Sequence, residues 1–147
     1  MKKLFLSLSL ILTVAAGTAF ASYKVNVNEE VKASFKNEFP GAQLIEWSST
    51  NDFAKATFML WGHRTEAYFT SDGQLQGSAR NLLYNQLPLA VMTAIDKKFT
   101  ETEVLDIVEI NNAEGTVYSL LLEINNKKYR VQADASGGIT KMKRLKN

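Results

Sequence analysis

The stretch VKASFKNEFPGAQLIEW, residues 31–47, decides the fold, because its apolar skeleton recurs sixty positions later as VMTAIDKKFTETEVLDI, residues 91–107. Val31, Phe35, Phe39, Ile45 and Trp47 align without a gap on Val91, Ile95, Phe99, Leu105 and Ile107. After a four-residue insertion the match resumes at an offset of sixty-four, where Phe58, Leu60, Phe69 and Leu75 fall on Leu122, Ile124, Ala133 and Ile139. The chain therefore contains two copies of one structural unit, with different polar residues between the conserved apolar positions.

Each copy is predicted to be a helix followed by strands. Val31, Phe35 and Phe39 recur every four residues and form one apolar stripe, which Asn28 can cap and Pro40 ends. Alternation and turn residues predict strands over 44–48, 53–62, 65–70, 104–110, 116–125 and 128–133, with short closing strands around Leu75 and Ile139. Residues 77–86 are predicted to be a connector between the copies.

The short spacings between the strands favour antiparallel pairing. The predicted fold class is α+β, with two tandem α-β-β-β(β) repeats, about 27–76 and 87–147, in one mostly antiparallel sheet. Both helices are expected on one face of this sheet. The repeated positions Phe39 and Trp47 are expected in the core and not in a ligand site.

The first 21 residues have the features of a signal peptide. Lys2 and Lys3 precede an apolar stretch, residues 4–16, and Ala19-Phe20-Ala21 is typical of a cleavage site, so the mature chain is expected to start at Ser22. A membrane anchor is the competing reading, but the apolar stretch is short and no cationic stop follows it. The sequence has no Cys. Export without disulfides is compatible with a periplasmic location, which is the predicted localisation; secretion beyond the cell is the alternative.

Removal of this leader also changes the charge. The full chain has 17 Lys and Arg against 15 Asp and Glu, and the loss of Lys2 and Lys3 leaves 15 of each. A neutral mature protein lacks the basic field that nucleic-acid binders need, so no nucleic-acid partner is expected. The remaining length of about 126 residues suits a single domain, residues 22–147.

The arrangement of motifs resembles a known family. Helix one is followed by Phe39-Pro40-Gly41-Ala42, Ile45-Glu46-Trp47, Ala67-Tyr68-Phe69 and Asp72-Gly73, and Leu87-Pro88 then opens the second copy. This order is similar to the PepSY-like, β-lactamase-inhibitor-like family of small exported bacterial proteins. The second copy departs from the pattern, with Thr100 for the proline and Ile107 for the tryptophan. The resemblance implies protein binding or inhibition in the cell envelope through a sheet, and it implies no catalytic residue.

The helix-free face of the predicted sheet carries the candidate binding residues. Because side chains alternate along a strand, the residues between the repeated core positions point to the opposite face. These candidates are Met59, Trp61, Tyr68, Leu121 and Arg130. Aromatic residues, Met and Arg are enriched at the centres of protein interfaces. The alternatives are that the connector 77–86 covers Trp61, that a homodimer buries it, or that a slip in register reverses the faces.

Catalytic and metal sites find little support in the sequence. His63 is the sole histidine, and one His without Cys or a carboxylate cluster makes a poor zinc site. It is expected in an exposed hairpin turn, and the serines lack the glycines of a nucleophile elbow. No catalytic residue, metal ligand or cofactor is therefore predicted.

The sequence thus predicts a non-catalytic periplasmic binding module. Its expected partner is an envelope protein of unknown identity, bound in an inhibitor-like manner on the helix-free face. The alternative is a small ligand, a glycan or a peptide, that binds to the same face with Trp61 stacking on it.

Overall fold

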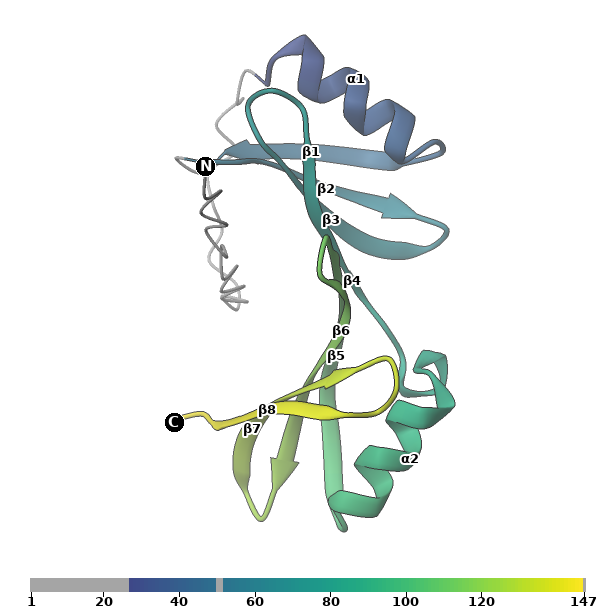
Figure 1. Cartoon of the computed structure of the whole chain (residues 1–147), viewed down its shortest axis with the longest axis vertical. Coiled ribbons are helices and arrows are strands. Elements are labelled where there is room, and N and C mark those ends of the chain that lie inside the picture. The colour runs from purple at the N-terminus through teal and green to yellow at the C-terminus, as the bar shows by residue number, and fades with distance from the viewer. Residues whose placement is uncertain (1–26, 50–51, 147) are drawn as a thin grey trace, which may run out of the picture.

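The computed structural model describes residues 27–49 and 52–146. The predicted leader, residues 1–21, and its cleavage site lie outside these ranges. The described chain forms the unit α-β-β-β-β twice, as Figure 1 shows. The helices are α1 (Glu29–Glu38) and α2 (Leu89–Lys98), and the strands are β1 (Gln43–Ser49), β2 (Ala54–Leu60), β3 (His63–Phe69), β4 (Leu75–Asn81), β5 (Thr102–Asn112), β6 (Gly115–Ile124), β7 (Lys127–Asp134) and β8 (Ile139–Arg144). A short 3-10 helix, η1 (Tyr84–Gln86), precedes α2.

All eight strands form one antiparallel sheet whose spatial order is the order of the chain, β1 to β8. Within each unit this topology follows from the short connections, because a strand that turns tightly pairs with the strand it has just left. Between the units, β4 and β5 pair although η1 and α2 lie between them in the chain. The predicted α+β fold and the duplication are confirmed. Within the described part of the chain, no helix is both long and apolar enough to cross a membrane.

The helices begin and end where local chemistry favours it. The side-chain oxygen of Asn28 accepts a hydrogen bond from the backbone N–H of Val31 at 2.9 Å, so the predicted N-cap of α1 is confirmed. Glu29 and Glu30 lie in the first turn, where the helix dipole favours acids. Lys97 and Lys98 lie in the last turn of α2, where it favours cations.

Strand register places both helices on the same face of the sheet. Paired residues of adjacent strands point to one face, and one row of pairs runs from Phe58 through Thr65, Arg80, Glu109 and Tyr118 to Ala133. Phe58 packs under α1 and Ala133 packs under α2. The opposite face carries no helix over the described residues, as the sequence predicts.

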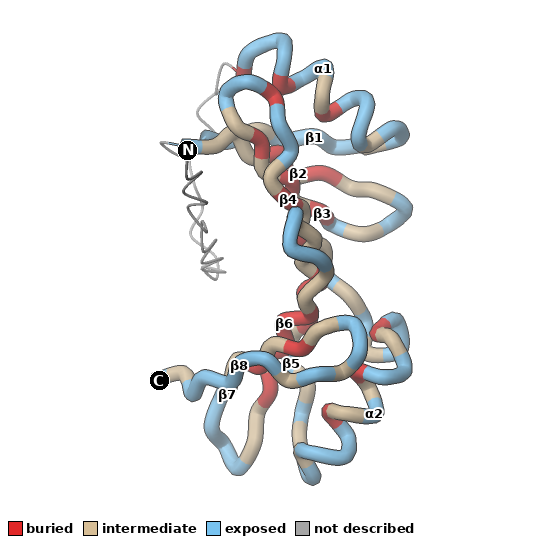
Figure 2. The backbone as a smooth tube through the Cα atoms, viewed as in Figure 1, coloured by how far each residue is buried: buried red, intermediate tan, exposed pale blue. Residues whose placement is uncertain are grey.

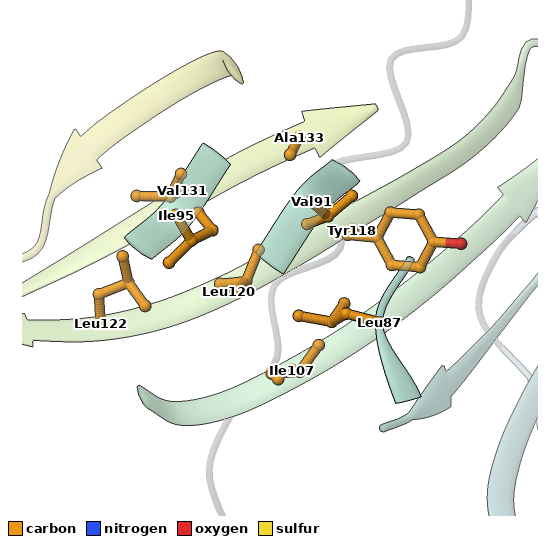
Figure 3. Packing of buried hydrophobic residues seen from close by; sticks show 9 residues of the cluster. All are labelled: Leu87, Val91, Ile95, Ile107, Tyr118, Leu120, Leu122, Val131 and Ala133. Carbon is orange, nitrogen blue, oxygen red and sulfur yellow. The ribbon is translucent and has the colours of Figure 1, made fainter. Parts of the chain in front are cut away.

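Each helix covers a separate core. Under α1 the core is aromatic: Phe35 lies 4.9 Å from Phe58, centre to centre, and 5.2 Å from Trp47. Under α2 it is mostly aliphatic, and Figure 3 shows Val91 and Ile95 of the helix above Leu120 and Val131 of the sheet. Figure 2 shows the buried segments of the two cores separated along the sheet. Phe39 and Trp47 pack against the core under α1 as expected, and both are half-buried.

The two units meet along β4 and β5. The sequence predicts a connector from residue 77, which is wrong for its first half, because Gly77 to Asn81 belong to β4 and pair with β5. A Cβ added at Gly77 would lie 2.8 Å from the carbonyl oxygen of Asn111, so the close approach of the strands requires glycine. Across this seam Arg80 donates two hydrogen bonds, of 2.8 and 3.2 Å, to the carboxylate of Glu109, which is only 8% exposed. The seam is thus held by backbone pairing and a bidentate ion pair.

Candidate binding surface

The structure places four of the five predicted binding residues on the helix-free face. Met59 on β2, Tyr68 on β3, Leu121 on β6 and Arg130 on β7 are all half-buried. They fall into two groups, because Leu121 and Arg130 are direct register partners while Met59 and Tyr68 lie in the other unit. β3 and β6 are three strand spacings apart, about 14 Å. The four residues therefore do not form a single cluster.

Small residues lie between the two groups. Gly77 and Ala79 of β4 are buried on this face, where Ala79 pairs with Ile110 of β5. Ile110 in turn pairs with Val117 of β6, and both are half-buried. The centre of the face is thus mostly apolar, with small residues on β4 and larger branched residues on β5 and β6.

The first group is built around the carboxylate of Glu66. Arg64 lies 3.0 Å from this carboxylate and Lys55 lies 3.5 Å from it. The hydroxyl of Tyr68 donates to it at 2.9 Å. Burial of the phenol, and then the adjacent negative charge of Glu66, raise the pKa of Tyr68 above its ordinary value. Tyr68 is therefore a neutral hydroxyl, held in one orientation.

The second group is built around Asp106 of β5. Its carboxylate lies 3.5 Å from Nη1 of Arg130 and accepts a hydrogen bond of 3.1 Å from the amide of Asn81. The ion pair with Arg130 is too long to count as a good hydrogen bond. Nη1 of Arg130 is buried and has no hydrogen-bond partner among the described residues. Arg130 is thus held by the negative charge of Asp106, and its Nη1 donor is not satisfied by any described residue.

Trp61, the fifth candidate, lies outside the strands. β2 ends at Leu60, and Trp61 and Gly62 form a two-residue turn in which both φ angles are positive, 50° and 81°. This is the type I′ pattern of tight hairpins. The ring is 82% exposed. The alternation rule placed Trp61 on the face itself, and the structure instead places it at the tip of the β2–β3 hairpin.

The connector does not cover Trp61. Leu82 and Tyr84 pack instead against the core under α2, so the alternative that the connector covers Trp61 is wrong. The hairpin does touch the connector at another point, where the ring nitrogen Nε2 of His63 lies 3.5 Å from the amide of Gln86. His63 is the first residue of β3 and is half-buried, so it does not occupy the exposed turn expected for it.

The described residues offer no built metal site. No group of three or more His, Cys, Asp or Glu side chains among them is arranged to hold a metal ion. The buried carboxylate of Glu109 already accepts hydrogen bonds from Arg80 and Asn111. Burial alone would raise the pKa of Glu109, but the hydrogen bonds from Arg80 and Asn111 outweigh it and hold the pKa below its ordinary value. This group is a structural ion pair.

Comparison with known proteins relates the fold to solved structures. No protein-family model matches the chain, and no curated protein matches its sequence. A BLIP-like protein from Bacteroides fragilis superposes with a TM-score of 0.77 at 23% identity, over 84% of this chain and 89% of that one. A predicted periplasmic protein from Bacteroides eggerthii gives 0.75 at 20% identity, over 82% and 91%. A DUF2874 family protein from Bacteroides uniformis gives 0.74 at 19% identity, over 80% and 88%.

These matches establish the fold that the sequence resemblance predicted. The chain has the architecture of BLIP-like proteins over most of its length. At identities of this size, the likeness extends to the fold alone.

Proposed function

We propose that this protein is a non-catalytic, protein-binding module of the bacterial periplasm that acts in an inhibitor-like manner. Its partner contacts the helix-free face of the sheet at Met59, Tyr68, Leu121 and Arg130, and Trp61 anchors it at the rim. The BLIP-like fold and the match to a predicted periplasmic protein support the type of function and the location.

The observation that carries this proposal is the placement of Trp61. At the offset of sixty-four, the equivalent turn of the second unit has Asn125, which has the same φ of 50°. Asn tolerates this backbone conformation, whereas a bulky residue there costs about 1 kcal/mol. The exposed indole also gains nothing from burial in the monomer. Trp61 therefore has a strained backbone and an exposed ring in the monomer. Burial of this ring against a partner would account for both features.

The ordered side chains of the face support the same function. Tyr68 is fixed by Glu66, and Glu66 is fixed by Arg64 and Lys55. Side chains that are already ordered lose little entropy on binding, so they favour recognition of a protein surface. Arg130, whose side chain is 24% exposed on this face, adds a cation that suits a carboxylate of the partner.

The test is a crosslinked pull-down from the native envelope. The protein would be compared with the double variant Trp61→Ala, Tyr68→Ala and with Leu89→Ala. Leu89 is a matched control because it is 74% exposed on α2 and lies on the helix side of the sheet. We expect one protein to be captured by the wild type and by Leu89→Ala and to be lost with the double variant. The purified partner should then bind the wild type in solution.

Two outcomes would contradict the proposal. Equal capture by a correctly folded double variant would place the interface elsewhere. Capture of no protein, together with binding of a glycan or peptide that quenches Trp61 fluorescence, would favour the small-ligand alternative. Because the ring of Trp61 is exposed, Trp61→Ala alone should weaken binding and leave the melting temperature nearly unchanged.

A further inference from the structure

An open apolar groove lies between α1 and the edge strand β1. Its volume is about 530 Å³, within the range of small-molecule sites. The apolar part of its lining consists of Phe35, Phe39, Pro40, Ala42, Ile45 and Trp47. Two of these residues, Phe39 and Trp47, are half-buried because the groove leaves one side of each ring uncovered. The groove is separate from the helix-free face, since Trp47 belongs to the row of side chains under α1.

The charge at the mouth of the groove is positive. Lys32 and Lys36, one turn apart on α1, are the charged groups among its described lining residues, and none of these residues is acidic. Lys32 already pairs with Glu29 at 2.7 Å. Lys36 makes no hydrogen bond or ion pair with any described residue. Its ammonium group is therefore available to an anion at the rim of an apolar cavity.

The second unit shows what fills the equivalent groove there. The offset of sixty places Met92, Asp96 and Ile107 at the positions of Lys32, Lys36 and Trp47. The side chain of Tyr84 packs on the core at this place. Its hydroxyl donates to the carboxylate of Asp96 at 2.5 Å and reaches the carbonyl oxygen of Met92 at 3.3 Å. An aromatic body with a polar head thus occupies the groove, and the head meets the residue equivalent to Lys36.

The connector also closes this groove along its strand side. The backbone N–H of Leu82 donates to the carbonyl oxygen of Ile107 at 3.0 Å, so the chain runs along β5 before it turns over α2. β1 has no such neighbour among the described residues, because it is the edge strand and pairs with β2 alone. Among the described residues, no side chain of the first unit takes the place that Tyr84 takes in the second. The counterpart of Tyr84 at the offset of sixty, Lys24, lies outside the described ranges.

From this comparison we propose that the α1–β1 groove binds a small carboxylate with an apolar body, either an aliphatic chain or an aromatic ring. The body packs between Phe39, Ile45 and Trp47, in the place that Tyr84 takes in the second unit, and the carboxylate pairs with Lys36. In the second unit the hydroxyl of Tyr84 binds the carboxylate of Asp96. In the first unit the carboxylate of the bound molecule would pair with the ammonium group of Lys36.

An added peptide strand fits this edge less well. β1 has a bulge between Gln43 and Glu46, and Leu44 adopts a left-handed conformation with φ of 51°. A bulge interrupts the regular row of backbone donors and acceptors that strand addition needs. The bulge leaves the groove itself accessible, so a compact ligand is favoured over an extended chain.

The test uses Trp47 as a reporter. The chain has two tryptophans, so the variant Trp61→Phe leaves Trp47 as the single one. Dodecanoate, below its aggregation concentration, and 4-phenylbutanoate serve as aliphatic and aromatic probes. Dodecyltrimethylammonium and 4-phenylbutylamine are the controls with matched bodies and opposite charge. We expect a saturable change in Trp47 emission with at least one carboxylate, and binding of its cationic counterpart at least tenfold weaker.

Charge variants then locate the head group. Lys36→Glu should weaken the carboxylate at least tenfold, and Lys36→Arg should retain it. Lys97→Glu, an exposed lysine in the last turn of α2, is the matched control and should bind as the parent does. Circular dichroism of each variant confirms that it is folded. The proposal is overturned if neither carboxylate produces a saturable change, if head-group charge makes no difference, or if binding survives in folded Lys36→Glu.

Discussion

The two units of this protein share an apolar skeleton and differ where side chains leave the core. The hairpin tip has Trp61 in the first unit and Asn125 in the second, on the same backbone conformation. The helix has Lys36 in the first and Asp96 in the second, and of the two only Asp96 has a partner among the described residues. The first unit thus exposes an indole and an ammonium group at positions where the second has an asparagine and a hydrogen-bonded carboxylate. Each unit contributes one edge strand to the sheet, β1 or β8. The first unit therefore carries more of the features that a binding partner could use.

The largest expected effect is the loss of stability when a core residue is truncated, and it tests whether the two units unfold together. Phe58 is 1% exposed and packs 4.9 Å from both Phe35 and Phe39, so Phe58→Ala should lower the free energy of unfolding by about 3–5 kcal/mol. Because β4 and β5 join the cores, we expect a single denaturation transition that moves as a whole, for this variant and for Leu122→Ala in the second unit. Chemical denaturation followed by circular dichroism measures it. Two separate transitions would show that the seam does not couple the units.

The seam itself gives the second prediction. Arg80→Met leaves the buried carboxylate of Glu109 without its cation and should cost about 2 kcal/mol, a value reduced because Arg80 is partly exposed. The pKa of Glu109 is lowered in the folded state, so the ion pair stabilises the fold above the ordinary glutamate pKa, and this stability is lost as pH falls through the lowered value. Denaturation from pH 7 to pH 3 should show a smaller acid loss in Arg80→Met than in the wild type. An identical pH profile would contradict this role.

The third prediction concerns the side chain that closes the second groove. Burial, and then the hydrogen bond to Asp96, raise the pKa of Tyr84 to about 12. Since the folded value lies above the ordinary value near 10, this contribution is present below pH 10 and is lost as pH rises through 12. Tyr84→Phe should cost about 1 kcal/mol at pH 7. Ultraviolet titration should show one late-ionising tyrosine fewer in the variant, and an unchanged titration would refute the hydrogen bond.

The smallest effect comes from exchanging the hairpin residues. Trp61→Asn should raise the free energy of unfolding by about 0.5–1 kcal/mol, because Asn accepts a positive φ more readily than a bulky residue does. Asn125→Trp should lower it by a similar amount. Thermal melts of both variants measure the exchange. If Trp61→Asn proved destabilising, the indole would have a structural role in the monomer, and the main support for the interface would be lost.

The sequence predicted the fold because the fold depends on its apolar residues. Two copies of one spacing gave the helices, most of the strands and the antiparallel order, and Asn28 marked the start of α1 correctly. β4 was missed beyond Leu75, because Gly77-Ser78-Ala79-Arg80-Asn81 lacks the apolar alternation by which strands are recognised. Its place in the sheet comes from its neighbours on both sides and from the contact of Arg80 with Glu109.

The candidate site could be predicted only in part. Alternation correctly assigned Met59, Tyr68, Leu121 and Arg130 to the helix-free face, since the period of two holds along any regular strand. It failed for Trp61, where the strand had already ended in a turn. It could not separate the four residues into two groups, because the distance across the sheet depends on strand order.

By itself, then, the sequence determined the duplication, the elements and the two faces of the sheet, because local periodicity and turn chemistry are properties of neighbouring residues. The order of the strands, which depends on tertiary structure, leaves β1 at the edge and β5 inside the sheet. Tyr84 therefore fills one groove, and no described side chain fills its copy. The physical reason is that the two units have the same apolar spacing but different neighbours in space, and these neighbours come from distant parts of the chain.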